Sequence, residues 1–483
     1  MTLPVIHVRM LSKAGIFIAI SAILFQFIYE AQPTAFIDEI FHVPQAQKFC
    51  DGHFNEWDPK ITTLPGMYIM SVFVLGPLTW LTGKGLCSLW VLRFFNVIYN
   101  TCNVLLCYLI LKKLREKVNP KEKSDSLKEE EKDNKEIEED SIQWASLAIG
   151  FFPLLYFYSF LYYTEPGSTT VVLLAYLACI NDYHRTAGVL GVVSILFRQT
   201  NIMWVVFMAG ITVSEKLDDI DAVEKIQASP ELKDKLARFF AKLLAAVVRY
   251  LLAVDHLLTI FNLIWPYLLV LCGFGGFVYL NQGLVVGDRS SHQAVLHLAQ
   301  LLYFSGFTLV FSFPILVTKD KITSFWQMVQ QRRNECLVSA AICCYILFSY
   351  SHEHPYLLAD NRHYVFYVWR WFLGRTALRY FAVPVYMYSA WSINDSLSKK
   401  CTSLWKLVYF ICVACLTAPQ KLLEFRYFIL PFVLFRLNVV QQTRTIIFLE
   451  LLIYAVINAL TVGIFLQKTF TWSDIPEPQR IIW

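Results

Sequence analysis

The chain of 483 residues is 56% hydrophobic and only 16% charged, whereas soluble proteins carry about 25% charged residues. One aqueous core cannot bury this much apolar surface, so lipid must solvate a large part of the chain. The net charge of +5 is too small to indicate nucleic-acid binding. Composition therefore excludes an ordinary soluble protein and predicts a protein embedded in a membrane.

Continuous apolar runs recur along the chain, and many approach the roughly 20 residues that a membrane helix needs. They lack the short alternating pattern of a transmembrane barrel. Because a helix satisfies its own backbone in lipid, we expect an all-α polytopic membrane protein with about 12–14 transmembrane helices. The candidate spans are 13–30, 88–111, 142–161, 169–182, 186–197, 200–214, 256–280, 295–318, 335–350, 378–394, 403–418, 427–438 and 445–467.

The first apolar run follows Arg9 and Lys13 and lacks a clear small-residue cleavage site. We interpret it as a retained span and not as a signal peptide. The apolar stretch 65–83 contains Pro65, Gly66, Gly76 and Pro77, which favour an interfacial helix over a span. With that choice, the basic loops fall on the cytoplasmic side, as the positive-inside rule requires.

The whole chain, 1–483, is then one membrane-embedded domain with three notable loops. Residues 31–87 form a first luminal loop with interfacial helices. Residues 112–141 are rich in charge, so we expect a disordered cytoplasmic loop there. Residues 215–255 have mixed charge and helical periodicity, which predict a cytoplasmic amphipathic segment.

The 12 cysteines are scattered, mostly within apolar runs, and show no disulfide framework. Cys412 and Cys415 form a CxxC inside an apolar segment, where buried thiols are more common than redox or zinc chemistry. We expect no metal site and no cofactor.

In this topology every unusual polar motif lies on the luminal side. The motifs are residues 36–42, 56–59, 163–165, 197–201, 287–292, 359–364 and 423–427. Charged groups at membrane depth are costly and usually functional, so their concentration on one face predicts a single site there.

Transfer of a sugar to a hydroxyl needs a carboxylate base, and the candidates are Asp38, Glu39 and Asp58. Asp38 and Glu39 could instead have only a structural role, as charged residues at the start of a helix. A phosphate needs cationic partners, and guanidinium binds it bidentately. The candidates for phosphate binding are Arg426, Arg362, Arg289, His363 and Arg198.

Each of these cations could also have a purely structural role. Arg289, Arg362 and Arg426 stand beside acids and could form local ion pairs, and Arg198 could be an interface arginine that snorkels. His363 could be a structural histidine. Three further residues could bind an acceptor sugar, namely Glu165, Trp57 and Tyr163.

The motifs resemble one known family. Residues 36–47, 57–66, 161–165, 197–202, 287–292, 357–364 and 419–428 are similar, in the same order, to the dolichyl-phosphate-glucose α-1,2-glucosyltransferase family. The resemblance runs from about residue 34 to the last residue, 483. The charged stretch 115–140 holds no family motif.

The resemblance implies a C-type glycosyltransferase fold with a catalytic first luminal loop, in the endoplasmic reticulum membrane. It implies transfer of glucose from dolichyl phosphate glucose to the terminal glucose of a diglucosylated dolichyl-diphosphate oligosaccharide. We expect Asp38 to be the base and Glu39 to orient Asp38 or the acceptor, with Asp58 as the rival base. The partners are then these two lipids and the bilayer, and no nucleic acid. A non-enzymatic membrane protein, such as a transporter, is the alternative.

Overall fold

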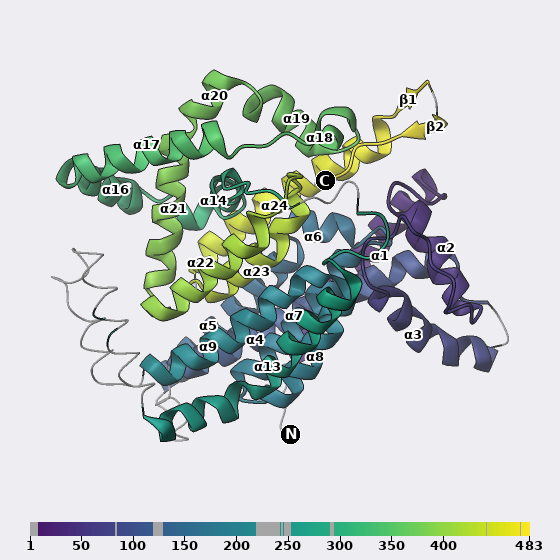
Figure 1. Cartoon of the computed structure of the whole chain (residues 1–483), viewed down its shortest axis with the longest axis horizontal. Helices are drawn as coiled ribbons and strands as arrows, with labels where there is room; N and C mark the ends of the chain where they lie inside the picture. The colour runs from purple at the N-terminus through teal and green to yellow at the C-terminus, as the bar shows by residue number, and fades with distance from the viewer. Residues whose placement is uncertain are drawn as a thin grey trace.

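The computed structural model describes residues 8–82, 85–118, 129–218, 242, 245, 253–289, 294–440, 442–473 and 475–483. Helices make up nearly all of the regular structure in these ranges, and a two-stranded antiparallel sheet follows the last helix. The helices pack side by side in one bundle, from which α2 and α3 project together (Figure 1).

The bounds of the elements follow the chain. The N-terminal part contains α1 (Val8–Ala31), α2 (Glu39–Cys50), α3 (Gly66–Thr82), α4 (Leu89–Val118), α5 (Glu129–Gly150), α6 (Pro153–Tyr158), α7 (Thr164–Ile180), α8 (His184–Phe197), η2 (Gln199–Asn201), α9 (Ile202–Asp218) and α13 (Val254–Asn281).

The C-terminal part contains α14 (Ala299–Phe311), α15 (Phe313–Leu316), α16 (Lys319–Gln331), α17 (Arg333–Ser349), α18 (Pro355–Ala359), α19 (Tyr364–Val368), η3 (Trp369–Leu373), α20 (Thr376–Phe381), α21 (Val383–Ser398), α22 (Ser403–Thr417), η4 (Phe425–Phe428), α23 (Ile429–Asn438), α24 (Arg444–Gln467), β1 (Phe470–Trp472) and β2 (Ile475–Gln479).

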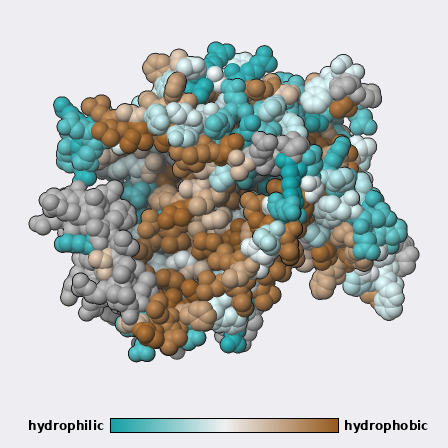
Figure 2. All heavy atoms as spheres, in the orientation of Figure 1, coloured by the Kyte–Doolittle hydropathy of each residue, from teal (hydrophilic) through white to brown (hydrophobic). Residues whose placement is uncertain are grey.

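Four of the described helices are long and apolar enough to cross a membrane, namely α1, α4, α13 and α24. Five shorter apolar helices of 10–17 residues accompany them in the described ranges. A broad band of apolar side chains covers the bundle on the face shown in Figure 2, while hydrophilic residues gather above and beside it. The prediction of an all-α polytopic membrane protein is confirmed; the number of 12–14 spans stays a prediction.

The core between the helices is rich in aromatic rings. Phe152, just before α6, stacks on Phe432 of α23 with ring centroids 4.4 Å apart and meets Phe311 of α14 edge-on at 5.2 Å. The same core holds a buried ion pair, in which Arg436 of α23 donates two hydrogen bonds to Glu450 of α24. A charge inside a membrane bundle is retained when it is paired in this way.

The charged stretch 112–141 is helical at both ends, so the prediction of a disordered loop is wrong there. α4 continues to Val118 and α5 begins at Glu129, and residues 119–128 lie outside the described ranges. The opposite charges pair between helices: Lys13 of α1 contacts Asp140 at 2.6 Å, and Arg115 of α4 pairs with Glu138. The high charge density of this stretch predicted disorder. The charges are of both signs, however, and they pair between helices. Most of the predicted segment 215–255 also lies outside the described residues.

The first loop is built around α2 and α3. Exposed apolar residues lie along α3, with Phe73 73% and Trp80 83% exposed, as an interfacial helix requires. Its first residue, Gly66, touches the end of α8 so closely that a Cβ atom would lie 2.5 Å from the carbonyl carbon of Leu196. Only glycine permits this approach, which fixes α3 against the bundle.

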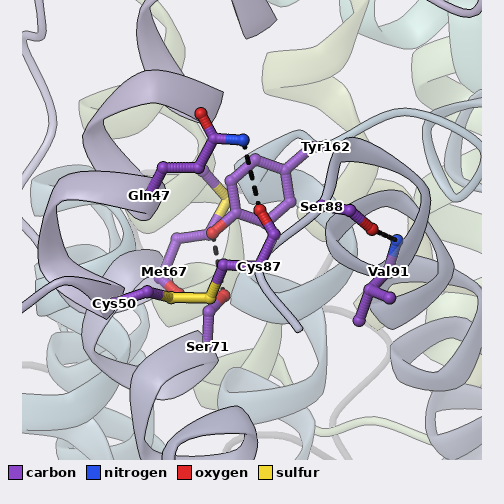
Figure 3. Close-up of a disulfide and its surroundings, with 8 residues drawn as sticks. All are labelled: Gln47, Cys50, Met67, Ser71, Cys87, Ser88, Val91 and Tyr162. Carbon is purple, nitrogen blue, oxygen red and sulfur yellow. Dashed lines mark hydrogen bonds between the residues drawn. A yellow bond between two sulfur atoms is a disulfide. The ribbon is translucent and has the colours of Figure 1, made fainter. Parts of the chain in front are cut away.

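A disulfide, which the scattered cysteines of the sequence did not indicate, joins the end of α2 to the segment before α4. Cys50 ends α2, Cys87 precedes α4, and the Gln47 amide donates to the Cys87 carbonyl at 3.2 Å (Figure 3). The two cysteines are 37 residues apart and form an isolated pair among the described residues. A single pair leaves no repeated spacing in the sequence, and for that reason it was not predicted.

Replacing Cys50 with serine should destabilise the protein, because the chain between the two cysteines regains freedom in the unfolded state. A cross-link of this size contributes about 2–4 kcal/mol. We expect a lower midpoint of thermal unfolding in detergent for Cys50→Ser, and a similar fall for the wild type in reductant. Cys272→Ser, at an exposed free thiol, is the matched control. Equal midpoints for Cys50→Ser and wild type would show that the cross-link contributes nothing.

Candidate functional site

Arg426 lies at the centre of a cluster of charges. Its Nε and Nη2 atoms donate to the two carboxylate oxygens of Glu424 at 2.7 and 2.9 Å. Its Nη1 atom donates to Oδ2 of Asp38 at 2.8 Å and lies 3.9 Å from Oε1 of Glu165. Glu165 in turn pairs with Arg198. We call these five residues the Arg426 cluster.

The cluster is assembled from the ends of elements far apart in the chain. Asp38 is the residue before α2, and Glu165 is in the first turn of α7. Arg198 follows α8 in an extended conformation, and Arg426 lies in η4. Asp38 and Arg426 are separated by 388 positions in the sequence. Loops between membrane helices have therefore brought together residues that the sequence analysis placed on one face.

The backbone just before Asp38 is strained. Ile37 is buried and has a φ of 53°, in the left-handed region that a β-branched residue rarely adopts. Such strain persists only where surrounding contacts impose it, and it gathers at functional sites. This residue therefore singles out the position of Asp38 from the other acids in the cluster.

Two carboxyl groups of the cluster, those of Asp38 and Glu424, are held in their ionised form. Burial acts to raise the pKa of Asp38, but the positive charge of Arg426 is the largest of the influences that oppose burial, and the net effect is a lowered pKa. Burial also raises the pKa of Glu424 and Arg426 lowers it, and the net effect is again a lowered pKa. The side chain of Asp38 is 36% exposed, against 17% for Glu424 and 2% for Glu165. Asp38 is thus an ionised acid that an incoming molecule can reach.

Glu39 has a different role from Asp38. Both of its oxygens accept hydrogen bonds from Arg93 of α4, at 2.8 and 2.6 Å, and both side chains are fully buried. Its carboxylate also accepts from the backbone N–H groups of Tyr162 and Phe36. Direct contact of Glu39 with an acceptor, one of its two predicted roles, does not fit this geometry. Its contacts fit the other role, because they fix the start of α2 beside Asp38.

Asp58, the rival base, lies outside the Arg426 cluster. Its Oδ1 atom accepts from the backbone N–H of Lys60 at 2.9 Å, and its own N–H donates to Gln45 of α2. The side chain is half-buried. The charges of Asp58 and Asp38 both act on Tyr68 of α3, so the two acids flank the same region. No arginine is seen to pair with Asp58 in the described part of the chain.

Two of the arginines predicted to bind phosphate, Arg289 and Arg362, make local contacts. Arg289 donates to the carbonyls of Val285 and Gln282 at 3.1 Å each, and so caps the end of α13. Arg362 is paired with Asp360 through two hydrogen bonds of 2.9 and 2.7 Å. Both guanidinium groups therefore have local partners, and their role in phosphate binding stays a prediction.

His363 and Arg198 lie nearer the acids of the cluster. The charge of His363 contributes to the lowered pKa of Asp38, and its Nδ1 atom lies 3.1 Å from the Trp483 carbonyl. Arg198 shares Glu165 with Arg426. The cationic side of the site is therefore Arg426 and Arg198, with His363 at its edge.

The two aromatic candidates for sugar binding, Tyr163 and Trp57, have different surroundings. Tyr163 is only 2% exposed, so its ring cannot stack on a sugar; its hydroxyl accepts from the Asp38 N–H at 3.3 Å. Trp57 is half-buried and packs against Tyr68 with ring centroids 5.8 Å apart. The indole N–H of Trp57 is buried without a hydrogen-bond partner. Trp57 remains suited to a polar ligand, whereas Tyr163 supports Asp38.

A pocket opens beside the arginines. Charged, polar and apolar side chains line it. Its lining includes Glu165, Arg198, Asn201, Trp204, Leu416, Arg426 and Leu430. Cations beside apolar walls are the combination that an anionic head attached to a hydrocarbon chain requires.

Sequence reasoning missed three partners in the site. Arg93 is a single arginine within an apolar span, which could have indicated a buried partner. Glu424 lies two residues before Arg426, in a motif placed at the site, but was given no role of its own. His42 falls four residues after Asp38, a spacing that places two side chains on one helix face. The expectation of no metal and no cofactor stays a prediction.

The fold and the Arg426 cluster define a multi-pass membrane protein whose loops gather acids and arginines around one pocket. The sequence model of the DIE2/ALG10 family matches residues 32–437, and the chain belongs to this family. No solved structure matches the chain significantly.

Relatives from several organisms match nearly the whole chain. The chain is 42% identical to a rat and to a human protein, each over 96% of both chains, and 33% identical to a Drosophila melanogaster protein over 92% of this chain and 93% of the relative. All three relatives are named Dol-P-Glc:Glc(2)Man(9)GlcNAc(2)-PP-Dol alpha-1,2-glucosyltransferase.

Removing the charge of Glu39 should strongly destabilise the protein, because Arg93 would stay buried without its counter-ion. Breaking such a pair costs about 3–5 kcal/mol. We expect Glu39→Gln to lower the midpoint of thermal unfolding markedly, while Glu30→Gln, at an exposed glutamate, has little effect. Adding Arg93→Met to Glu39→Gln should restore part of the loss. A Glu39→Gln protein as stable as the wild type would show that the pair is dispensable.

Proposed function

We propose that this protein transfers glucose from dolichyl phosphate glucose to the terminal glucose of a diglucosylated dolichyl-diphosphate oligosaccharide. The new bond is an α-1,2 linkage. The observation that carries the proposal is the direct pairing of an accessible, ionised acid, Asp38, with an arginine, Arg426, beside the pocket. The names of the relatives supply the substrates, and they disfavour the non-enzymatic alternative.

The proposed reaction inverts the sugar in one displacement, since the donor is β-linked and the product α-linked. A single base then suffices, and a second, nucleophilic carboxylate is not required. Asp38 removes the proton from the acceptor 2-hydroxyl as its oxygen bonds to C1 of glucose. The bond from C1 to the phosphate oxygen breaks, and the electron pair stays on dolichyl phosphate.

Arg426 connects the two substrates in this scheme. A lipid phosphate that enters beside Arg198 and Arg426 competes with Asp38 for the Nη1 atom of Arg426. As that ion pair weakens, the pKa of Asp38 rises toward its ordinary value and the carboxylate becomes a stronger base. Binding of the donor phosphate would thereby make Asp38 a stronger base.

The location follows from the same features. We assign the Arg426 cluster to the luminal side of the endoplasmic reticulum membrane. The Cys50–Cys87 disulfide lies in the same loop as Asp38, and disulfides persist in oxidising compartments such as this lumen. A C-type glycosyltransferase fold, with the first loop carrying the base, is part of the proposal.

The base assignment is tested by exchanging acids for amides. Asp38→Asn keeps the size of the side chain but cannot accept a proton, so turnover with purified donor and acceptor lipids should fall about 10²–10⁴-fold. Asp58→Asn should reduce turnover much less, and Asp51→Asn, at an exposed acid ending α2, should match the wild type. An inactive Asp58→Asn beside a fully active Asp38→Asn would move the base to Asp58.

The role of Arg426 is tested at limiting donor. Negative charge grows on the lipid phosphate as the glycosidic bond breaks, so Arg426→Ala should lower turnover as well as donor affinity. Arg426→Lys keeps the charge without the planar fork, so it should recover only part of the loss. Arg375→Ala, at an exposed arginine, is the control. Wild-type turnover by a folded Arg426→Ala protein would exclude the phosphate role.

A further inference from the structure

His42 is a titratable residue beside Asp38 that the proposed reaction has not yet used. It lies one turn along α2, and its backbone N–H donates to the Asp38 carbonyl at 3.1 Å. Its side chain is half-buried. Residues four apart on a helix share a face, so the imidazole and the carboxylate lie on the same side of α2.

The two nitrogens of the His42 ring have different surroundings. Nδ1 is hydrogen-bonded to the hydroxyl of Tyr68, a buried residue of α3. Among the described residues, Nε2 has no hydrogen-bond partner. The ring is therefore anchored through one nitrogen, while the other remains available for a proton or for water.

Charged groups from three elements act on this ring. Burial is the largest influence and lowers the pKa of His42; the carboxylates of Asp38, Glu165 and Glu39 raise it, and Arg426 lowers it. Together with the Tyr68 hydroxyl, these are the groups that face the ring from α2, α3, α7 and η4. The net effect is a lowered pKa, so the ring is neutral near pH 7 and able to take up a proton.

A proton acceptor is needed after the transfer. Asp38 then holds the proton of the acceptor hydroxyl. When dolichyl phosphate leaves, Arg426 is free to pair with Asp38 again, and the carboxyl group must lose that proton. The ionised carboxylate then stabilises a positive charge on the neighbouring imidazole.

We propose that His42 is a further catalytic residue, which takes up at Nε2 the proton that Asp38 removed from the acceptor and passes it to water. The proposal rests on the proposed glucosyl transfer. Its balance is complete: the acceptor O–H and the bond from C1 to the phosphate oxygen break, and the new glycosidic bond forms. The phosphate keeps the electron pair, and the proton moves from Asp38 to His42 and then to solvent.

The experiment is a pH–rate profile of full-length protein with saturating donor and acceptor lipids. His42→Gln has an amide that can still bond to Tyr68 but cannot hold a proton. We expect at least a roughly tenfold fall in kcat, at the low end of what loss of a general acid–base group causes. Protonated His42 cannot accept a proton, so wild-type activity should fall as pH drops through the pKa of His42. In His42→Gln that limb should move to lower pH, where only the protonation of Asp38 still limits the reaction. His53→Gln, at an exposed histidine of the same loop, is the matched control and should keep both the rate and the limb.

The outcomes separate this inference from the proposed function. Wild-type kcat and an unchanged acidic limb in His42→Gln, with Asp38→Asn inactive, would overturn the role of His42 and leave the transfer intact. A fully active Asp38→Asn would instead overturn the proposed mechanism. If His42→Gln does not fold, Tyr68→Phe replaces it, since it removes only the hydroxyl that anchors Nδ1. A displaced acidic limb in Tyr68→Phe supports the proposal, and an unmoved limb contradicts it.

Discussion

The guanidinium of Arg426 is the contact on which the rest of the site depends. Three carboxylates surround it, and each would repel the others if it were absent. It satisfies Glu424 through two parallel hydrogen bonds and still reaches Asp38 with its remaining nitrogen. A lysine has a single charged centre and could not make this set of directed contacts. The ends of α2 and α7 therefore meet η4 because one planar cation serves all three.

A site made from loops needs rigid support, and the first loop receives it from two sides. The ion pair between Glu39 and Arg93 ties the start of α2 to α4 in a fully buried contact. The disulfide from Cys50 to Cys87 ties the end of α2 to the segment before α4. With both ends of α2 fixed to one membrane helix, Asp38 has little freedom to move relative to the bundle. Such support is what holds a reactive group in a productive geometry.

Much of this arrangement could be predicted from the sequence. Membrane helices could be predicted from the long apolar runs, because lipid imposes a length and a composition that are visible in the sequence. The one-sided placement of polar motifs brought Asp38, Glu165, Arg198 and Arg426 into one list. What could not be predicted was which charge pairs with which: Arg289 and Arg362 found partners nearby, and Glu39 found Arg93. Those choices depend on distances between helices, which local sequence does not encode. The ends of the charged stretch were also misjudged, since helices can extend into solvent when charges of both signs pair across them.

The separation of Asp38 from Arg426 has a consequence for biosynthesis. These residues are 388 positions apart, and a ribosome adding about 5–20 residues per second needs roughly 20–80 s to make that length of chain. Throughout this interval Asp38 has been synthesised but Arg426 has not. Arg93 and Cys87, by contrast, emerge soon after α2 and can secure the loop early. The order of the chain thus lets the nascent protein fix the shape of its first loop long before the charge that completes it arrives.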